Sequence, residues 1–440
     1  MNDDDDEITV FSSDKERADY LKERYGVDIE KEPELSIEKK EEPKNTLKYF
    51  FKQIEDGNIE GVKQYINNGG DVNASDLVFN SGMHLAHNNP EILSVLIEHG
   101  GNVNAETFGG YSVLHEAVKS QNKESVDLLL KHGAEINTKA MQGDTPLINA
   151  CSNGNIEIIN SLLDHGANVN QRGKFGETPL HYSAKFDDLN LAQKMIDLGA
   201  DVNAVSKYNQ SPLHTACEFQ NYKVAEFLVN NNADVNLKTE HGNTPLHNSC
   251  SDNRTDFVEL FLKNGADVNS INNNHESPLH ISCKNRAYET SGLLIENGAN
   301  VNSHNNDEES PLHLSCLKND YRTTSLLIQN GADIHQETND NNLTPLHYAC
   351  RSKKIDCVDL LLNKGANVEN VKYYLNQSGI YREDYGDIKA YLEKRESRER
   401  LTTELNKPKI NSELMDKLNN SVKDYDYDRP RQSHSMTMKI

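Results

Sequence analysis

A tetrapeptide of the form Ser/Thr-Pro-Leu-His recurs along this chain of 440 residues at an almost constant interval. Successive copies are 33, 33, 33, 33 and 34 residues apart, and they lie at Thr178–His181, Ser211–His214, Thr244–His247, Ser277–His280, Ser310–His313 and Thr344–His347. Repetition at a fixed period of this length is typical of a chain built from stacked copies of one small unit. One large spherical core is therefore disfavoured, and the low hydrophobic content of 35% agrees with that.

A second marker repeats in the same register. It reads Gly-Ala, then an acidic residue or Asn, then Val-Asn or a close variant, and Asn232 replaces one of its glycines. The glycines are Gly133, Gly166, Gly199, Gly265, Gly298, Gly331 and Gly365. Two independent markers thus share one period.

Each unit contains the signals for two helices. Thr178 is a good N-cap, and Pro179 at the first helical position loses no donor that the helix needs, so a short helix is expected to begin there and to end near Asp187. A second stretch has apolar residues at helical spacing, as between Ile156 and Leu163, and Gly166 is expected to terminate that helix. Such pairs bury one face against the next pair.

On these residues the sequence resembles the ankyrin-repeat family, whose unit is a β-turn followed by two antiparallel helices. The resemblance implies an all-α solenoid, an ankyrin-repeat stack of helix-turn-helix units joined by β-turn or hairpin loops, with about ten repeats over residues 46–370. The first units depart from the pattern: Tyr49, Phe50 and Phe51 replace Pro-Leu-His, and the helix region of the second unit is two residues short.

The flanks differ from the array in charge. The formal charge of −23 divides into −8 over residues 1–45, −17 over residues 46–370 and +2 over residues 371–440. We expect residues 1–45 to be an acidic, mostly disordered leader, residues 371–406 a C-terminal helical cap, and residues 407–440 a disordered tail.

Composition also excludes several classes of protein. A strongly acidic chain repels phosphate backbones, so no nucleic acid is expected as a partner. No apolar run approaches the ~20 residues of a membrane span, and the acidic start lacks the features of a secretory signal. We therefore expect a monomeric protein with reduced thiols and a cytoplasmic location, with the nucleus as the alternative.

Histidines and cysteines form two periodic sets instead of one cluster. The His ladder is His84, His115, His181, His214, His247, His280, His313 and His347, and the Cys ladder is Cys151, Cys217, Cys250, Cys283, Cys316 and Cys350. Equivalent positions of packed helices lie about 8–10 Å apart, too far for a disulfide or a shared zinc ion. We expect buried core cysteines, no metal, no cofactor and no catalytic residues. The family resemblance implies that the histidines bond each helix start to the neighbouring turn.

Partner specificity is expected at the positions that vary between units, which are the turn tips and the exposed ends of the short helices. Aromatic and basic residues gather there in the third to seventh units, and such residues anchor interfaces. The candidate contact residues are Phe108, Tyr111, Lys139, Arg172, Lys174, Phe175, Phe186, Lys207, Tyr208, Phe219, Tyr222, Lys238 and Arg254. The alternative interpretation is that the tips vary freely and that the lysines are only solvated.

The sequence also leaves open a second binding surface and a covalent modification. The later turn tips, with Asp307, Glu308 and Glu309, are acidic and could receive a basic peptide. The resemblance also implies that Asn203 and Asn269 match a position that asparaginyl hydroxylases modify.

The sequence predicts a non-enzymatic scaffold that binds another protein on the concave ridge of turn tips and short helices. The alternative is a substrate-recognition adaptor of a ubiquitin ligase or other enzyme complex, in which residues 371–440 recruit the enzyme. A third hypothesis is an effector that acts on a host protein.

Overall fold

The computed structural model describes residues 46–339, 342–377 and 386–405. The chain divides into two compact units, residues 1–72 and 73–440. The expected leader and the expected tail beyond residue 406 lie outside the described residues. Within the described part of the first unit, Thr46 caps α2 (Leu47–Glu55), and Asn58 caps α3 (Ile59–Asn67).

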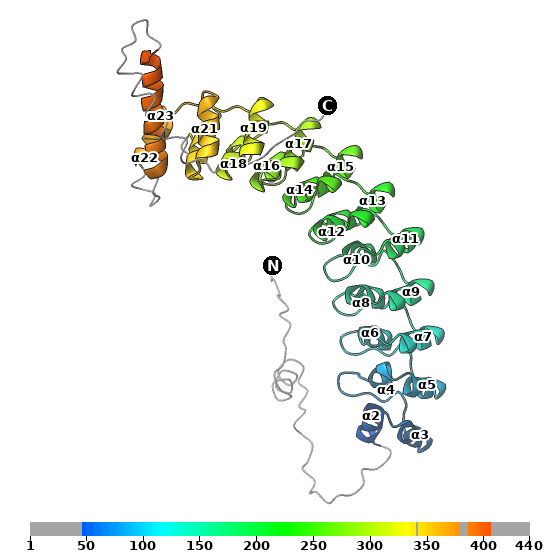
Figure 1. Ribbon diagram of the computed structural model, residues 1–440. Helices are drawn as coiled ribbons and strands as arrows, with labels where there is room; N and C mark the ends of the chain where they lie inside the picture. Colours follow the sequence, from blue (N-terminus) through cyan, green and yellow to red (C-terminus); the bar gives the residue numbers. More distant parts are fainter. Residues whose placement is uncertain (1–45, 340–341, 378–385, 406–440) are drawn as a thin grey trace, which may run out of the picture. The chain divides into compact units, whose positions relative to one another are not determined.

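The second unit repeats a pair of helices that lie in two rows (Figure 1). The first helices of the pairs, called the short helices here, are α4 (Gly82–Leu85), α6 (Val113–Lys119), α8 (Pro146–Asn153), α10 (Pro179–Phe186), α12 (Pro212–Glu218), α14 (Pro245–Ser251), α16 (Pro278–Lys284), α18 (Pro311–Leu317) and α20 (Pro345–Arg351). The second helices are α5 (Pro90–Glu98), α7 (Lys123–Lys131), α9 (Ile156–Asp164), α11 (Leu189–Asp197), α13 (Tyr222–Asn230), α15 (Thr255–Lys263), α17 (Tyr288–Glu296), α19 (Tyr321–Gln329) and α21 (Ile355–Asn363).

The helix boundaries follow from the capping residues that the sequence repeats. In α10 the Thr178 hydroxyl lies 2.9 Å from the Nδ1 atom of His181, which also accepts the Thr178 amide hydrogen. Proline occupies the first helical position, as the pattern predicts. The helix ends where Asp187 adopts a left-handed conformation with φ of 56°, and Gly166 with φ of 87° follows the end of α9 in the same way.

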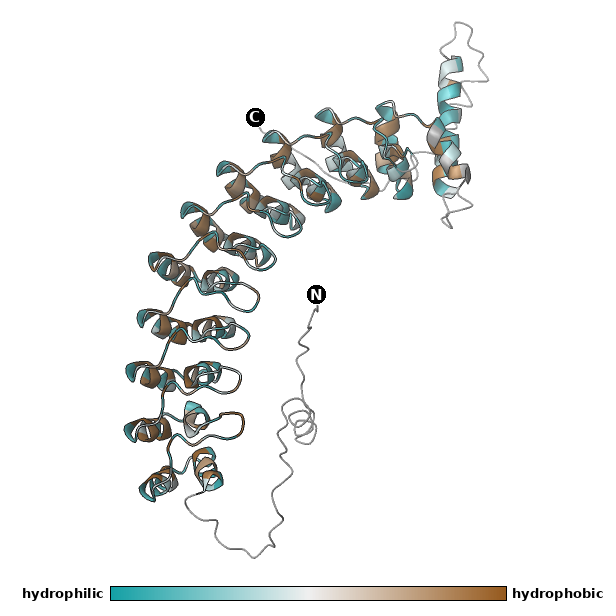
Figure 2. Cartoon of the chain, turned by 180° about the vertical axis from the view of Figure 1, so that it is seen from behind, coloured by the Kyte–Doolittle hydropathy of each residue, from teal (hydrophilic) through white to brown (hydrophobic). Residues whose placement is uncertain are grey.

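The core is a ribbon between successive pairs. Leu180 and Leu213 of two successive short helices are fully buried, as are Leu129 and Leu162 of second helices. Figure 2 shows hydrophobic residues, in brown, on both rows of helices. Each pair buries its apolar face against its neighbours, so the core grows by one increment per unit. The predicted all-α repeat solenoid is confirmed.

The second repeat shows a local departure from the pattern. Its short helix α4 has only four residues and continues as a 3₁₀ turn, η1 (Ala86–Asn88). The two-residue deletion predicted an irregularity here, and the shortened helix is its result. Between loop and helix, the described residues form isolated β-bridges instead of strands, at Ser75–Ser81 and Glu106–Ser112.

Two more helices follow the last pair, α22 (Glu369–Gln377) and α23 (Gly386–Leu405), in the segment where a cap was expected. Ile388 and Leu392 of α23 are buried. From the same helix, the Tyr391 hydroxyl donates to Asp359 of α21 over 2.5 Å, and the Arg395 guanidinium pairs with that carboxylate at 2.6 Å.

Candidate functional site

The loops before the short helices form narrow projections that we call fingers. They comprise residues 74–80, 105–111, 138–144, 171–177, 204–210, 237–243, 270–276 and 303–309. Backbone hydrogen bonds close the turns of fingers 138–144 and 171–177, where Ala140 and Gly173 stand at the base, and a short polar side chain at that position adds to the closure in the other fingers. Asp76 accepts the amide hydrogens of Val78 and Asn80, and the Ser206 hydroxyl accepts those of Tyr208 and Gln210. The turn is thereby fixed without any contribution from the side chains at its tip.

From the finger 105–111 onward, histidine links each finger to the preceding short helix, except the finger 171–177, which follows α8 with Ile148 at that position. His214 of α12 accepts the Ser211 amide hydrogen at Nδ1 and bonds through Nε2 to the carbonyl oxygen of Asn243, 3.1 Å away in the next finger. Because Nδ1 accepts, Nε2 carries the proton and donates. Burial lowers the pKa of His214 to about 4, so the ring is neutral at physiological pH and keeps both bonds. The expected role of the His ladder is confirmed.

Backbone hydrogen bonds then fix the fingers relative to one another. The Lys207 amide donates to the Phe175 carbonyl over 2.8 Å, and the Glu240 amide donates to the Tyr208 carbonyl over 2.9 Å. At one step a carboxylate replaces the carbonyl, since the Lys174 amide donates to Asp144 over 2.8 Å. The tips therefore form a row with regular spacing.

This row carries large apolar side chains on five successive fingers. Leu77, Phe79, Phe108, Met141, Phe175 and Tyr208, which we call the fingertip row, are between 46% and 72% exposed. Other groups close the turns, so the fold of each finger does not require a side chain of this size at its tip. Of the candidate residues, Phe108, Phe175 and Tyr208 belong to this row.

The candidate residues omit three members of the row, Leu77, Phe79 and Met141. Leu77 lies seven residues before His84, just as Phe108 lies seven residues before His115. Counting back from the His ladder would therefore have found Leu77, although the Pro-Leu-His tetrapeptide is absent from that unit.

Five of the six candidate cations, all except Arg254, lie on the four fingers between residues 138 and 243. Lys174 holds its ammonium nitrogen 5.6 Å from the centroid of the Phe175 ring. Arg172 and Lys238 donate to the carbonyls of Val205 and Ile271 in the following finger. Within residues 46–339, 342–377 and 386–405, none of Lys139, Arg172, Lys174, Lys207 and Lys238 pairs with a carboxylate.

Tyr111, in contrast, is part of the finger's own framework. It is half-buried, and its ring packs edge-on against His115 with the centroids 5.8 Å apart. Its carbonyl accepts a hydrogen bond from His84 Nε2.

The remaining candidates gather at the other end of the short helices. Phe186 ends α10 and Phe219 follows α12, and the Lys185 ammonium lies 5.8 and 5.4 Å from their ring centroids. Both phenylalanines are exposed. The predicted residues thus occupy two lines, the fingertips and these helix ends, separated by the length of a short helix.

Tyr222 and Arg254 are half-buried at the starts of second helices. The Tyr222 ring stands edge-on to Phe257 at 5.5 Å, and the Arg254 guanidinium lies 4.7 Å from the same ring. Arg254 also pairs with Asp256 at 2.7 Å. These contacts give both residues a packing role between successive pairs.

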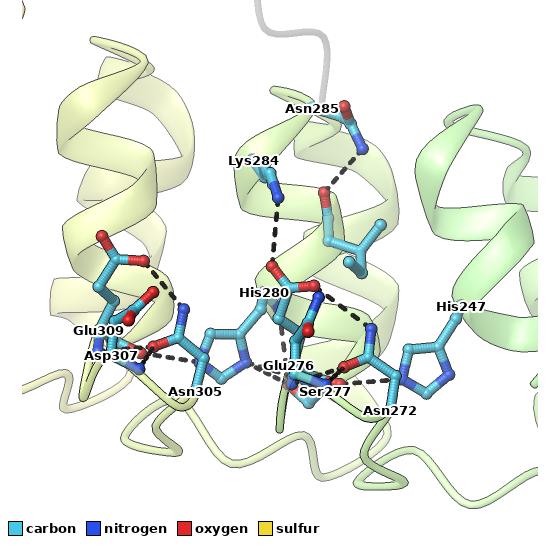
Figure 3. Close-up of polar contacts among 12 residues, drawn as sticks. His247, Asn272, Glu276, Ser277, His280, Lys284, Asn285, Asn305, Asp307 and Glu309 are labelled. Carbon is cyan, nitrogen blue, oxygen red and sulfur yellow. Dashed lines mark hydrogen bonds and ion pairs between the residues drawn. The ribbon is translucent and has the colours of Figure 1, made fainter. Parts of the chain in front are cut away.

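The later fingers are polar, and Asn and Glu close them (Figure 3). Asn272 accepts the Glu276 amide hydrogen, and Asn305 accepts that of Glu309. The two glutamates border a pocket of about 510 Å³ against α16 and α18. Lys284, also on that pocket, pairs with Glu276 at 3.3 Å.

The cysteines and histidines form no reactive centre in the described part of the chain. All seven cysteines are buried and unpaired, and burial raises the pKa of Cys283 to about 12. The described residues contain no cluster of three or more His, Cys, Asp or Glu that could hold a metal ion. The expected buried Cys ladder is confirmed.

The asparagines of the second marker connect neighbouring units. Asn269 donates to the Gly298 carbonyl over 3.1 Å and accepts the Asn300 amide hydrogen over 2.8 Å. Asn203 makes the same pair of bonds with Asn232 and Asp234. These bonds account for the recurrence of Asn, and hydroxylation at these positions stays a prediction.

Comparison with protein families identifies the repeat. The family described as ankyrin repeats in three copies matches residues 51–140, 147–239, 213–305 and 279–372. A comparison with curated proteins finds no match. Among the described residues, no helix has the length and apolar character needed to cross a membrane.

Proposed function

Since the chain belongs to the ankyrin-repeat family, whose repeats are generally protein-interaction modules, we propose that it is a non-enzymatic scaffold that binds a partner protein along the fingertip row. The observation that carries this proposal is the exposure of Phe108, Met141, Phe175 and Tyr208 on four successive, laterally bonded fingers. Burial of one such side chain contributes roughly 1.5–3 kcal/mol. Four neighbouring large apolar side chains on a rigid support can therefore anchor an interface.

The test compares two double variants of the full chain. Phe175→Ser with Tyr208→Ser removes two rings from the fingertip row. Leu189→Ser with Leu198→Ser is the matched control, because these leucines are also exposed but belong to α11 and its end. We expect the fingertip variant to lose partner binding by at least about tenfold and the control to retain it. Equal recovery of partners by the wild type and the fingertip variant would contradict the proposal.

The acidic fingers are a weaker candidate for the binding surface. Glu276 is already paired with Lys284, and Lys318 also lines the pocket beside Glu309. A basic peptide would have to compete with these ammonium groups.

The adaptor function uses the same surface and differs only in what residues 371–440 recruit. Partner recovery with the full chain and with residues 46–370 separates the two functions. An enzyme subunit recovered only with the full chain supports an adaptor, whereas identical recovery supports a scaffold.

A further inference from the structure

We propose that the basic fingers, residues 138–144, 171–177, 204–210 and 237–243, bind an extended acidic segment of the partner protein, with one acidic side chain at every third position. This inference rests on the proposed function, because it specifies what kind of partner the fingertip row accepts.

Charge is the first argument. The four basic fingers together have a formal charge of +2, within an array whose charge is −17. The two fingers that follow, residues 270–276 and 303–309, have a charge of −4. None of the finger cations pairs with a carboxylate of the described residues, so within that part of the chain their charge remains available to an incoming anion. A partner with acidic side chains is attracted to this part of the row and repelled by the fingers beyond it.

The regular spacing of the fingers is the second argument. Packed helices lie about 8–10 Å apart, and the backbone bonds from Lys207 to Phe175 and from Glu240 to Tyr208 hold the tips at the spacing of the units. A polyproline II chain rises about 3.1 Å per residue and brings every third side chain to the same side, about 9 Å apart, so three residues span one step. A β-strand does not fit, because its side chains alternate between two sides and every third one faces the other way. A helix would present a different face to each finger.

The pairing of charge with apolar surface is the third argument. Lys174 adjoins Phe175, and Lys207 precedes Tyr208 at the equivalent position of the next finger. Each of these tips offers one cation and one ring. A segment that places an acidic and an apolar residue on the same side of an extended backbone matches both groups at every step.

Selection from a random library of displayed linear peptides tests the proposal. The bait is the full chain, and peptides that also bind the Phe175→Ser, Tyr208→Ser variant are discarded. Four fingers require about twelve residues of extended chain, which sets the library length. We expect the selected peptides to be acidic, with Asp or Glu recurring at intervals of three. Neutral or basic peptides that depend on the fingertip row, or acidic peptides without that interval, would overturn the proposal.

The contribution of charge is measured on one selected peptide. The Lys174→Glu, Lys207→Glu variant should weaken its binding by about tenfold or more. The control is Lys131→Glu with Lys223→Glu, which changes the net charge equally at exposed positions of α7 and α13 and should have little effect. A peptide with its acids replaced by lysine should bind the Lys174→Glu, Lys207→Glu variant better than the wild type. Equal losses in both variants would show only the effect of net charge and would overturn the proposal.

Failure of this inference is distinguishable from failure of the proposed function. If no peptide depends on Phe175 and Tyr208, but partner capture still does, the row binds a folded surface and the extended segment is wrong. If capture is also independent of these two rings, the fingertip row is not the binding surface.

Discussion

At the residue scale, some side chains hold a repeat unit together and others are exposed without a structural role. His214 has a structural role, because both ring nitrogens are bonded and the ring is fully buried. Phe175 has none, because its finger is closed by backbone bonds and its ring remains exposed. This division explains why stability and partner binding should respond to different substitutions.

Replacing His214 should therefore loosen one unit. In His214→Ala the Asn243 carbonyl and the Ser211 amide lose their partner, which should cost about 1–3 kcal/mol. Hydrogen exchange should show faster opening of α12 and of the finger 237–243. The control is His241→Ala at an exposed tip, where the change should stay within about 0.5 kcal/mol. Equal protection in both variants would contradict the role given to the His ladder.

The cysteines should be unreactive while the chain is folded. Burial raises the pKa of Cys350 to about 12 and that of Cys357 to about 11, so little thiolate exists at neutral pH. We expect a thiol reagent to label the native protein very slowly and all seven cysteines after denaturation. Rapid labelling of a cysteine in the native protein would show that the packing around it is wrong.

At the element scale, local signals determine the short helices and much of the fold could be predicted. Pro179 and Thr178 mark where α10 begins, and the repeated register transfers that boundary from unit to unit. The irregular α4 could be predicted only as a departure, because a two-residue deletion can be absorbed in a helix or in a loop. In the second repeat the deletion shortens the helix, which continues as a 3₁₀ turn.

The candidate site was less predictable than the helices, for a physical reason. An aromatic residue at a helix start can face solvent or a neighbouring unit, and only tertiary packing decides between them. Tyr222 packs on Phe257, and Tyr111 packs on His115, whereas Phe175 stays exposed. The repeat period gives the position of a residue within its unit, but it does not show which side chain of the next unit packs against that residue.

The histidines that join short helices to fingers should make stability depend on pH. The folded pKa is about 4 for five of them: His181, His214, His247, His280 and His313. The unfolded value is about 6.5, so between these values the unfolded chain binds more protons. The free energy of unfolding should then decrease as pH falls from about 6.5 towards about 4, and these groups should have no effect above about pH 7.

Denaturant midpoints at about pH 7 and about pH 5 check this expectation. The midpoint should be lower at the acidic pH. In His214→Gln one of these groups is absent, so the loss of stability between the two pH values should be smaller than in the wild type. A midpoint that is equal or higher at the acidic pH would contradict neutral, buried histidines.

Helix α23 should protect the last helix pair. Leu392 is buried, and Tyr391 and Arg395 of the same helix bond to Asp359 of α21. Leu392→Asp places a charge in this contact and should cost roughly 3 kcal/mol. Hydrogen exchange of α21 should accelerate, whereas Arg400→Asp at an exposed position of α23 should leave it unchanged. If α21 exchanges at the same rate in both variants, α23 is not a cap.

At the scale of the whole molecule, the charge is distributed unevenly. The array carries −17, yet the basic fingers carry +2 beside the exposed rings of Phe175 and Tyr208. The excess of acidic residues favours solubility, because like charges keep molecules apart. The basic fingers that carry these rings have the opposite charge to the rest of the array, and we assign the binding surface to them for that reason.

Binding along the fingers can be measured by hydrogen exchange of the full chain, alone and with the partner recovered by capture. We expect slower exchange in the fingers 105–111, 138–144, 171–177, 204–210 and 237–243, and no change in the second helices α7, α9, α11 and α13. Protection confined to those second helices, with the fingers unchanged, would contradict binding along the fingers.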